Sequence, residues 1–200
     1  MRNSILRSVS DVIRAAQLLQ SESALVFIEA AASMLVDCFR SENKLLVCGN
    51  GGSLCDAMHF SEELSGFYRE KRKALPAIAL CEQGFLTCVG NDVGYDQVFS
   101  RGVEAHGKKG DVLAVLTTSG NSTNIALALR AARAQGLKTI AFLGKTGGQC
   151  KDLADIEWIV EGFKWSDRIQ EAHMAAIHII IEQLETALFS KTSPYAFSQV

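Results

Sequence analysis

Short apolar runs alternate with amphipathic helical patterns from residue 44 to residue 189, and this alternation is the strongest constraint on the fold. The runs cover residues 44–48, 77–80, 112–116, 139–143 and 156–160. They are nearly uninterrupted by polar residues, as expected of strands that are buried on both faces. Strands of this kind between helices predict a doubly wound α/β fold, in which a parallel sheet is flanked by helices. A ligand should then bind at the carboxyl ends of the strands.

Helical patterns also precede and end this region. Apolar residues at helical spacing predict helices over 5–16 and 24–39, with a break and cap at residues 21–23. The buried side of the second helix is expected to be Leu25, Ile28, Ala32, Leu35, Val36 and Phe39. A last helix over residues 166–189 is apolar nearly all round, which predicts burial against the domain or against another subunit. We expect one domain over residues 1–200, with N-terminal helices in 1–40, an α/β core in 44–189 and a loose tail in 190–200.

Composition narrows the class of protein. A formal net charge of -2 at pH 7 and a hydrophobic content of 48% are typical of a soluble globular protein and give no electrostatic drive toward nucleic acid. The chain has no apolar run long enough to span a bilayer and opens with no signal-peptide pattern. The six cysteines lie in apolar surroundings without a C-x-x-C pair. We therefore expect buried reduced thiols and a cytoplasmic location.

Two loops between a strand and a helix are rich in glycine and hydroxyl groups. The first, GNGGS, follows KLLVC and precedes a helix that should begin near Leu54. The second, TTSGNS, follows DVLAVL and offers four hydroxyls, those of Thr117, Thr118, Ser119 and Ser122. Glycines let backbone N–H groups approach a ligand and helix N-termini favour anions, so both loops suit a phosphate. The alternative for either loop alone is an ordinary turn with an N-cap.

Two helices carry side chains that can move protons or bind a metal. His59 and Glu63 are four residues apart in the helix after GNGGS and lie on one face. Gln170, His173 and His178 lie in the last helix. Together, His59, Glu63, Gln170 and His178 suit either a divalent-metal site or an acid/base pair, and spacing does not choose between them. Gln170 and His178 are ~12 Å apart along a straight helix, so His173 stays a rival and the helix could serve a neighbouring subunit.

A sugar phosphate is the ligand class that these parts share. The loops offer a hydroxyl-lined phosphate cradle, and the helices offer a carboxylate and imidazoles. In an aldose–ketose isomerase, a base removes a proton next to the carbonyl and an acid protonates the carbonyl oxygen, which gives an enediol. The residues therefore favour an isomerase of sugar phosphates. Two nucleotide-binding motifs are excluded. GNGGS lacks the G-x-G-x-x-G spacing of a dinucleotide site, and it is not followed by the Gly-Lys-Ser/Thr of a Walker A loop.

Four segments carry a family resemblance: CGNGGSLCDAMHFSEEL, VGNDVGYDQVFSR, TTSGNS and DRIQEAHMAAIH. In this order and spacing they resemble the phosphoheptose isomerase family of the sugar isomerase (SIS) domain superfamily, over roughly residues 3–189. The resemblance implies an SIS-type, Rossmann-like fold. It also implies conversion of D-sedoheptulose 7-phosphate to D-glycero-D-manno-heptose 7-phosphate, a step toward the ADP-heptose of lipopolysaccharide core. A homotetramer with active sites between subunits is a further implication.

The resemblance also implies roles for individual residues. Glu63 would be the general base, in contact with substrate, and His178 would be the general acid. Zinc would be bound by His59, Glu63, Gln170 and His178. The phosphate would be held by Ser53, Thr118, Ser119 and Ser122. The sugar would be lined by Asn50, Gly51, Gly52, Asn91, Asp92, Thr117 and Gln170, with Asp167 close by.

Three positions depart from the family pattern. Thr117 stands where the family usually has serine, Leu54 where many members have histidine, and Phe67 where some have arginine. Polar contacts from the last two positions are therefore absent. Two alternatives stay open: a non-catalytic SIS regulator that binds a protein partner or a sugar phosphate, and an isomerase of another sugar phosphate. Such regulators lack the catalytic carboxylate and histidine, so the presence of Glu63 and His178 favours the enzyme.

Overall fold

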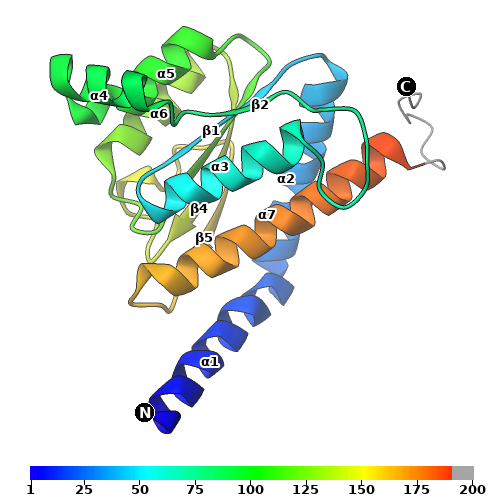
Figure 1. Cartoon of the computed structure of the whole chain (residues 1–200), viewed down its shortest axis with the longest axis vertical. Coiled ribbons are helices and arrows are strands. Elements are labelled where there is room, and N and C mark those ends of the chain that lie inside the picture. The colour runs from blue at the N-terminus through cyan, green and yellow to red at the C-terminus, as the bar shows by residue number, and fades with distance from the viewer. Residues whose placement is uncertain (191–200) are drawn as a thin grey trace.

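The structure is a computed structural model that describes residues 1–190, so from residue 191 the expected tail lies outside the described residues. Within that part, five strands form one parallel sheet in the order β2-β1-β3-β4-β5 (Figure 1). The predicted α/β fold is confirmed, and each predicted run matches its strand to within one residue at either end. The strands are β1 (Leu45–Gly49), β2 (Ala77–Ala79), β3 (Val112–Thr117), β4 (Lys138–Gly144) and β5 (Ile156–Val160). That residues 1–200 form one domain stays a prediction.

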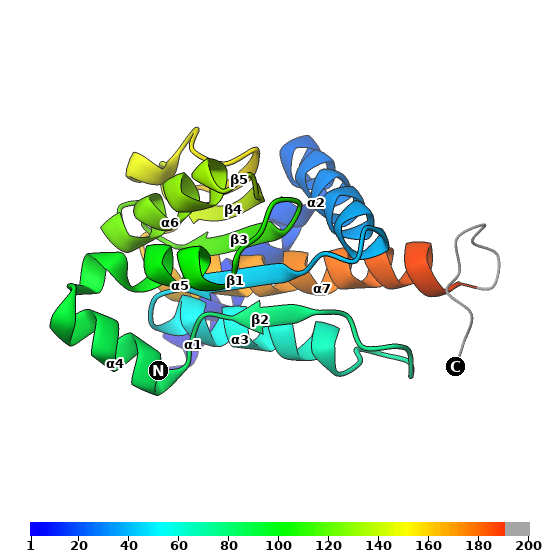
Figure 2. The ribbon, with the colours of Figure 1, turned by 90° about the horizontal axis from the view of Figure 1, so that it is seen from above.

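Helices cover both faces of the sheet (Figure 2). One face is packed by α2 (Glu22–Arg40), α3 (Gly52–Ser65) and α7 (Ser166–Phe189). The other is packed by α4 (Gln83–Asp92), α5 (Val98–His106) and α6 (Thr123–Ala134), with the short turns η2 (Tyr95–Gln97) and η3 (Gly148–Cys150) nearby. In β1, Leu45 and Val47 join the first core, whereas Leu46 and Cys48 join the second. Because each central strand supplies both cores, its sequence is apolar throughout.

The N-terminal helices match the predicted pattern at the cap but not on every face. Ser21 is the N-cap of α2, and its hydroxyl accepts a hydrogen bond from the Ala24 N–H at 3.3 Å. Leu25 was expected on the buried side but is exposed, because Ala24 and Phe27 supply the buried face of the first turn. The other five predicted residues are buried. α1 (Arg2–Gln17) and the turn η1 (Leu18–Gln20) come before α2, and α1 extends away from the sheet (Figure 1).

The last helix has the bounds that its pattern predicts. α7 packs against α2 and α3 of the same chain, which explains its apolar circumference. Its buried residues include Ile169, Ala176, Ile180 and Leu184. No helix within residues 1–190, α7 included, is apolar over enough length to cross a membrane.

The six cysteines differ in burial, and Cys81 is intermediate. Cys38, Cys48 and Cys150 are buried, and burial raises the pKa of the Cys150 thiol to about 11. Cys55 and Cys88 are exposed, so the prediction of burial is wrong for these two. They lie on α3 and α4, helices that turn one side to solvent, and a residue's apolar neighbours in sequence do not decide which side it occupies.

Candidate active site

The GNGGS loop carries the chain from the end of β1 into α3. Gly51 has a φ of +57°, a conformation that side chains other than glycine rarely adopt. A Cβ on Gly52 would lie 2.4 Å from Gln170 Nε2, so the missing side chain lets the loop approach α7. α3 begins at Gly52, two residues before the predicted start, which places the buried Ser53 in its first turn. The loop thus lies at a helix N-terminus, where an anion is favoured.

The hydroxyls of the TTSGNS loop differ in what they contact. Thr117 Oγ1 accepts a hydrogen bond from the Gly120 N–H at 3.2 Å, and Ser119 Oγ accepts one from the Asn121 N–H at 3.1 Å. The Thr118 hydroxyl donates to Ser166 Oγ at 3.1 Å, at the start of α7. Ser122 is the N-cap residue of α6, yet its side chain makes no capping hydrogen bond. The ordinary-turn alternative explains the hydroxyls of Thr117 and Ser119 but not that of Ser122.

A pair of amide side chains joins the two loops. Asn50 Nδ2 donates to Asn124 Oδ1 at 2.9 Å, and Asn124 Nδ2 donates back to Asn50 Oδ1 at 3.0 Å. The Tyr95 hydroxyl donates to the same Asn50 oxygen at 2.9 Å. Asn124 and Tyr95 were missed by sequence reasoning. The signal for Asn124 was a polar residue among the buried apolar residues of α6.

Three titratable side chains from two helices meet at one point. Glu63 Oε1 lies 3.2 Å from His59 Nε2, on the same helix, and 3.6 Å from His178 Nε2, on α7. One ligand atom from each residue lies within 4.8 Å of the others. The two imidazole rings meet edge to face with centroids 5.3 Å apart. The structure therefore brings together three of the four residues that were grouped from the sequence.

The second oxygen of the same carboxylate is unusual. Glu63 Oε2 is buried and has no hydrogen-bond partner within residues 1–190. A buried, unpaired carboxylate oxygen costs free energy unless a proton or cation compensates it. Two imidazoles and a carboxylate are donors that zinc prefers, and three protein ligands leave a position open for substrate. The chemistry of the donor set therefore fits a divalent cation as well as an acid/base pair.

Known proteins identify the family. The family model described as "SIS domain" matches residues 7–144. The chain belongs to the SIS domain family. It is 53% identical over 180 residues to the phosphoheptose isomerase of Vibrio cholerae serotype O1, with 90% of this chain and 93% of that protein covered. Similar structures are the phosphoheptose isomerases of Neisseria gonorrhoeae (TM-score 0.81) and Francisella tularensis (0.82), each 35% identical to this chain. The matches cover 92% of this chain in both cases, and 98% and 96% of those chains.

This homology makes the SIS protein an enzyme of the sugar-phosphate isomerase class. The alternative of a non-catalytic regulator is therefore set aside. What each predicted site residue does stays a prediction, and the structure adds where each one lies.

Gln170 lies beside the start of α3, against Gly52, whereas Glu63 lies near the end of that helix. Asn91 donates to Asp92 Oδ1 at 2.6 Å at the end of α4, and Asp167 Oδ1 accepts from the Arg168 N–H at 2.9 Å.

His173, the rival of His178, proves to be a core residue. It is fully buried between Phe142 and Trp158, and its Nε2–H donates to the Leu143 carbonyl at 2.9 Å. Burial lowers the pKa of this imidazole to about 4. The rival His173 is therefore not part of the Glu63 group, because its ring points to the sheet instead of to α3.

Two more neighbours of the Glu63 group were missed from sequence. The Tyr68 ring stacks on the His178 ring, with centroids 5.6 Å apart and planes 16° apart. Asp56, one turn before His59, has a buried Oδ2 without a hydrogen-bond partner within residues 1–190. Burial raises the pKa of Asp56 to about 6, although His59 acts in the opposite direction. Two of the positions that differ from the family pattern are Leu54, which packs against the core, and Phe67, which is exposed.

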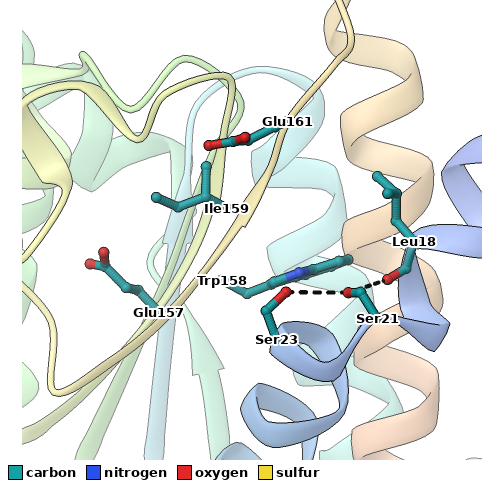
Figure 3. Close-up of a pocket in the computed structure, with 7 residues that line it drawn as sticks. All are labelled: Leu18, Ser21, Ser23, Glu157, Trp158, Ile159 and Glu161. Atoms are coloured by element: carbon teal, nitrogen blue, oxygen red, sulfur yellow. Dashed lines mark hydrogen bonds between the residues drawn. The ribbon is translucent and has the colours of Figure 1, made fainter.

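A cavity of about 470 Å³ lies elsewhere in the SIS enzyme, between β5 and the start of α2 (Figure 3). It is lined by Leu18, Ser21, Ser23, Glu157, Trp158, Ile159 and Glu161, none of which is a predicted site residue. Two carboxylates in its wall oppose the binding of a phosphate anion. The cavity therefore does not replace the two loops as the phosphate site.

Proposed function

We propose that this SIS enzyme converts D-sedoheptulose 7-phosphate to D-glycero-D-manno-heptose 7-phosphate, a step toward ADP-heptose. The name of the Vibrio cholerae relative supports the substrate class. The observation that carries the proposal is the Glu63 carboxylate between two imidazoles, with His178 Nε2 3.6 Å away. An isomerase needs a base and an acid within reach of adjacent carbons, and this pair meets that need.

The reaction would use the two groups in turn. The Glu63 carboxylate takes a proton from C1 of the open-chain ketose, and His178 gives a proton to the C2 carbonyl oxygen. The product of this step is the enediol, with hydroxyls on C1 and C2. Return of the first proton from Glu63 to C2 and transfer of the O1 proton to His178, which restores the acid, then give the aldose. The phosphate would be held by the hydroxyls and helix N-termini of the two loops, away from the reacting carbons.

We further propose that zinc binds at His59, Glu63 and His178. Bound zinc would act as a Lewis acid that polarises the substrate carbonyl. The carboxylate has two oxygens, of which Oε1 faces the imidazoles and Oε2 has no partner within residues 1–190. One oxygen could thus face the cation while the other accepts the proton.

A site between subunits is supported by the position of Gln170. Two ligands of one zinc ion lie within roughly 4 Å of each other, whereas Gln170 and His178 are separated by ~12 Å along α7. Side chains on a helix all lean toward its N-terminus, so Gln170 and His178 lean in the same direction and the lean does not close the gap between them. A Gln170 that binds the same zinc would therefore come from another subunit, as in a homotetramer.

The test is an activity assay with a matched pair of variants. Sedoheptulose 7-phosphate is incubated with the full chain, with and without zinc and after chelation, and the heptose phosphate is followed by NMR. Glu63→Gln keeps the shape of the side chain but cannot act as a base, so we expect turnover to fall at least ~100-fold while calorimetry shows nearly unchanged substrate binding. Glu62→Gln, on the exposed neighbour whose Oε1 lies 3.8 Å from His59 Nε2, should lower turnover far less than Glu63→Gln.

Wild-type-like turnover in Glu63→Gln would sink the proposed role of Glu63. No turnover of sedoheptulose 7-phosphate by folded wild-type protein that still binds it would instead point to another sugar phosphate as substrate.

A further inference from the structure

An arginine outside the predicted site connects α3 to α7. Arg72 lies in the loop between α3 and β2, which passes beside α7 (Figure 1). Its side chain is only 4% exposed, and its Nε donates to Glu185 Oε1 of α7 at 2.6 Å. The Glu185 side chain is also largely buried, at 15% exposure. Removal of one partner of such a pair strongly destabilises a protein, because the other charge is left buried and unpaired.

The same guanidinium caps the C-terminal end of α3. Nη2 donates to the Glu63 carbonyl at 2.7 Å, and Nη1 donates to the Leu64 carbonyl at 2.8 Å and to the Gly66 carbonyl at 3.2 Å. The last carbonyls of a helix lack donors within the helix and carry the negative end of its dipole. A planar fork of five N–H donors suits this task better than an ammonium does. Arg72 therefore holds the backbone of Glu63, the proposed base.

Glu185, the residue of α7 that Arg72 contacts, lies on the same side of the helix as His178, the proposed acid. Glu185 follows His178 by seven residues, which is close to two helical turns, so both lie on nearly the same face of α7. Arg72 thus links the backbone of Glu63 to the face of α7 that carries His178. The 3.6 Å separation between Glu63 Oε1 and His178 Nε2 depends on how these two helices are held together.

We propose that Arg72 is a positioning residue of the isomerase, which sets the spacing of Glu63, His59 and His178 by clamping the end of α3 to α7. The inference rests on the proposed function for its kinetic test.

Arg69 provides a matched contrast on the same loop. It pairs with Glu182 of the same helix at 2.8 Å, but the two side chains are 60% and 42% exposed, and exposed pairs of this kind contribute little.

The experiment compares Arg72→Met with Arg69→Met in the full chain. For Arg72→Met we expect kcat for sedoheptulose 7-phosphate to fall roughly 10- to 100-fold, because small misplacements of reacting groups are costly. KM should change less than about threefold, because the phosphate loops do not contact Arg72. Arg69→Met should lower kcat far less than Arg72→Met, because Arg69 is exposed and reaches the site indirectly, through the Tyr68 ring, which it overlies at 5.1 Å. A loss of fold would also lower the apparent kcat at unchanged KM, so the folded fraction of each variant is measured by circular dichroism and kcat is expressed per folded molecule.

A second readout does not need turnover. Zinc affinity, measured by competition with a chelator, reports the spacing of His59, Glu63 and His178. Loss of a residue that orients metal ligands typically lowers affinity 10- to 100-fold, so we expect Arg72→Met to bind zinc roughly tenfold more weakly than Arg69→Met.

Arg72→Lys is a second variant for the case in which Arg72→Met does not fold. Lysine keeps the buried charge but cannot reach the carboxylate and both carbonyls at once, so kcat and zinc affinity should lie between those of wild type and Arg72→Met. Unchanged kcat and unchanged zinc affinity in folded Arg72→Met, or in Arg72→Lys where only that variant folds, would overturn the inference. An inactive wild type would refute the proposed function, and the zinc comparison would then decide the role of Arg72 alone.

Discussion

Gly52→Ala should damage the site of this enzyme without damaging its fold. The new Cβ would lie 2.4 Å from Gln170 Nε2 and 3.0 Å from its Cδ and Oε1. These atoms are the far end of a flexible side chain, so Gln170 can swing away at a cost of about 0.5–1.5 kcal/mol. Alanine in a helix is more stable than glycine by about 0.5–1 kcal/mol. The two effects nearly cancel, so the free energy of unfolding should change by less than about 1 kcal/mol, equivalent to a few degrees in Tm.

Activity should respond quite differently. Displacement of Gln170 should lower kcat/KM for sedoheptulose 7-phosphate roughly 10- to 100-fold. If the effect passes through Gln170, the double variant Gly52→Ala, Gln170→Ala should be no worse than Gln170→Ala alone.

The control for this variant is Gly90→Ala. Gly90 lies in α4, and a Cβ there would meet no atom of residues 1–190 within 4 Å, so activity should stay at the wild-type level. A drop of more than ~2 kcal/mol in the stability of Gly52→Ala, or a double variant much worse than Gln170→Ala, would refute the reasoning, because either result would place the effect in the loop backbone.

Two further predictions concern other parts of the enzyme. Ser119→Ala with Ser122→Ala should weaken binding of the phosphorylated sugar about tenfold or more, since a hydrogen bond to a charged group contributes about 1.5–3 kcal/mol; unchanged affinity in calorimetry would mean that the phosphate binds elsewhere. His173 has a folded-state pKa of about 4, below its ordinary value, so it takes up a proton more readily when unfolded. Its contribution to stability is present above about pH 6.5 and is lost as pH falls toward 4. His173→Gln should flatten this slope in denaturant titrations at several pH values, and an equally steep slope would assign it to other groups.

The sheet could be predicted from sequence because its strands are buried on both faces. Residues such as Leu45 and Leu46 point to opposite cores, so both must be apolar and the run is easily recognised. α2 shows where this reasoning stops. Periodicity indicates that one side of the helix is buried, but it does not fix the edges of that side, and Leu25 falls just outside it.

The site was predicted only where its members are close in sequence or belong to a motif. His59 and Glu63 share one turn of helix, which spacing reveals. Asn124 meets Asn50 across 74 positions of sequence, and Arg72 meets Glu185 across 113. No local pattern encodes such pairs. Spacing left the choice between His173 and His178 open for a related reason, because α7 is apolar nearly all round and its pattern does not distinguish the side toward the sheet from the side toward α3.

α7 relates the parts of the site to one another. Between Ser166 and Glu185 it meets, in order, Thr118 of the second loop, Gly52 of the first loop, the Glu63 carboxylate and Arg72. These contacts are spread over ~29 Å of helix. Close-packed apolar residues hold the helix against the sheet along this length, so it cannot shift at one contact without disturbing the others. The spacing between the phosphate loops and the acid/base group is therefore a property of how α7 packs, and the apolar residues of that helix position the site although none of them takes part in its chemistry.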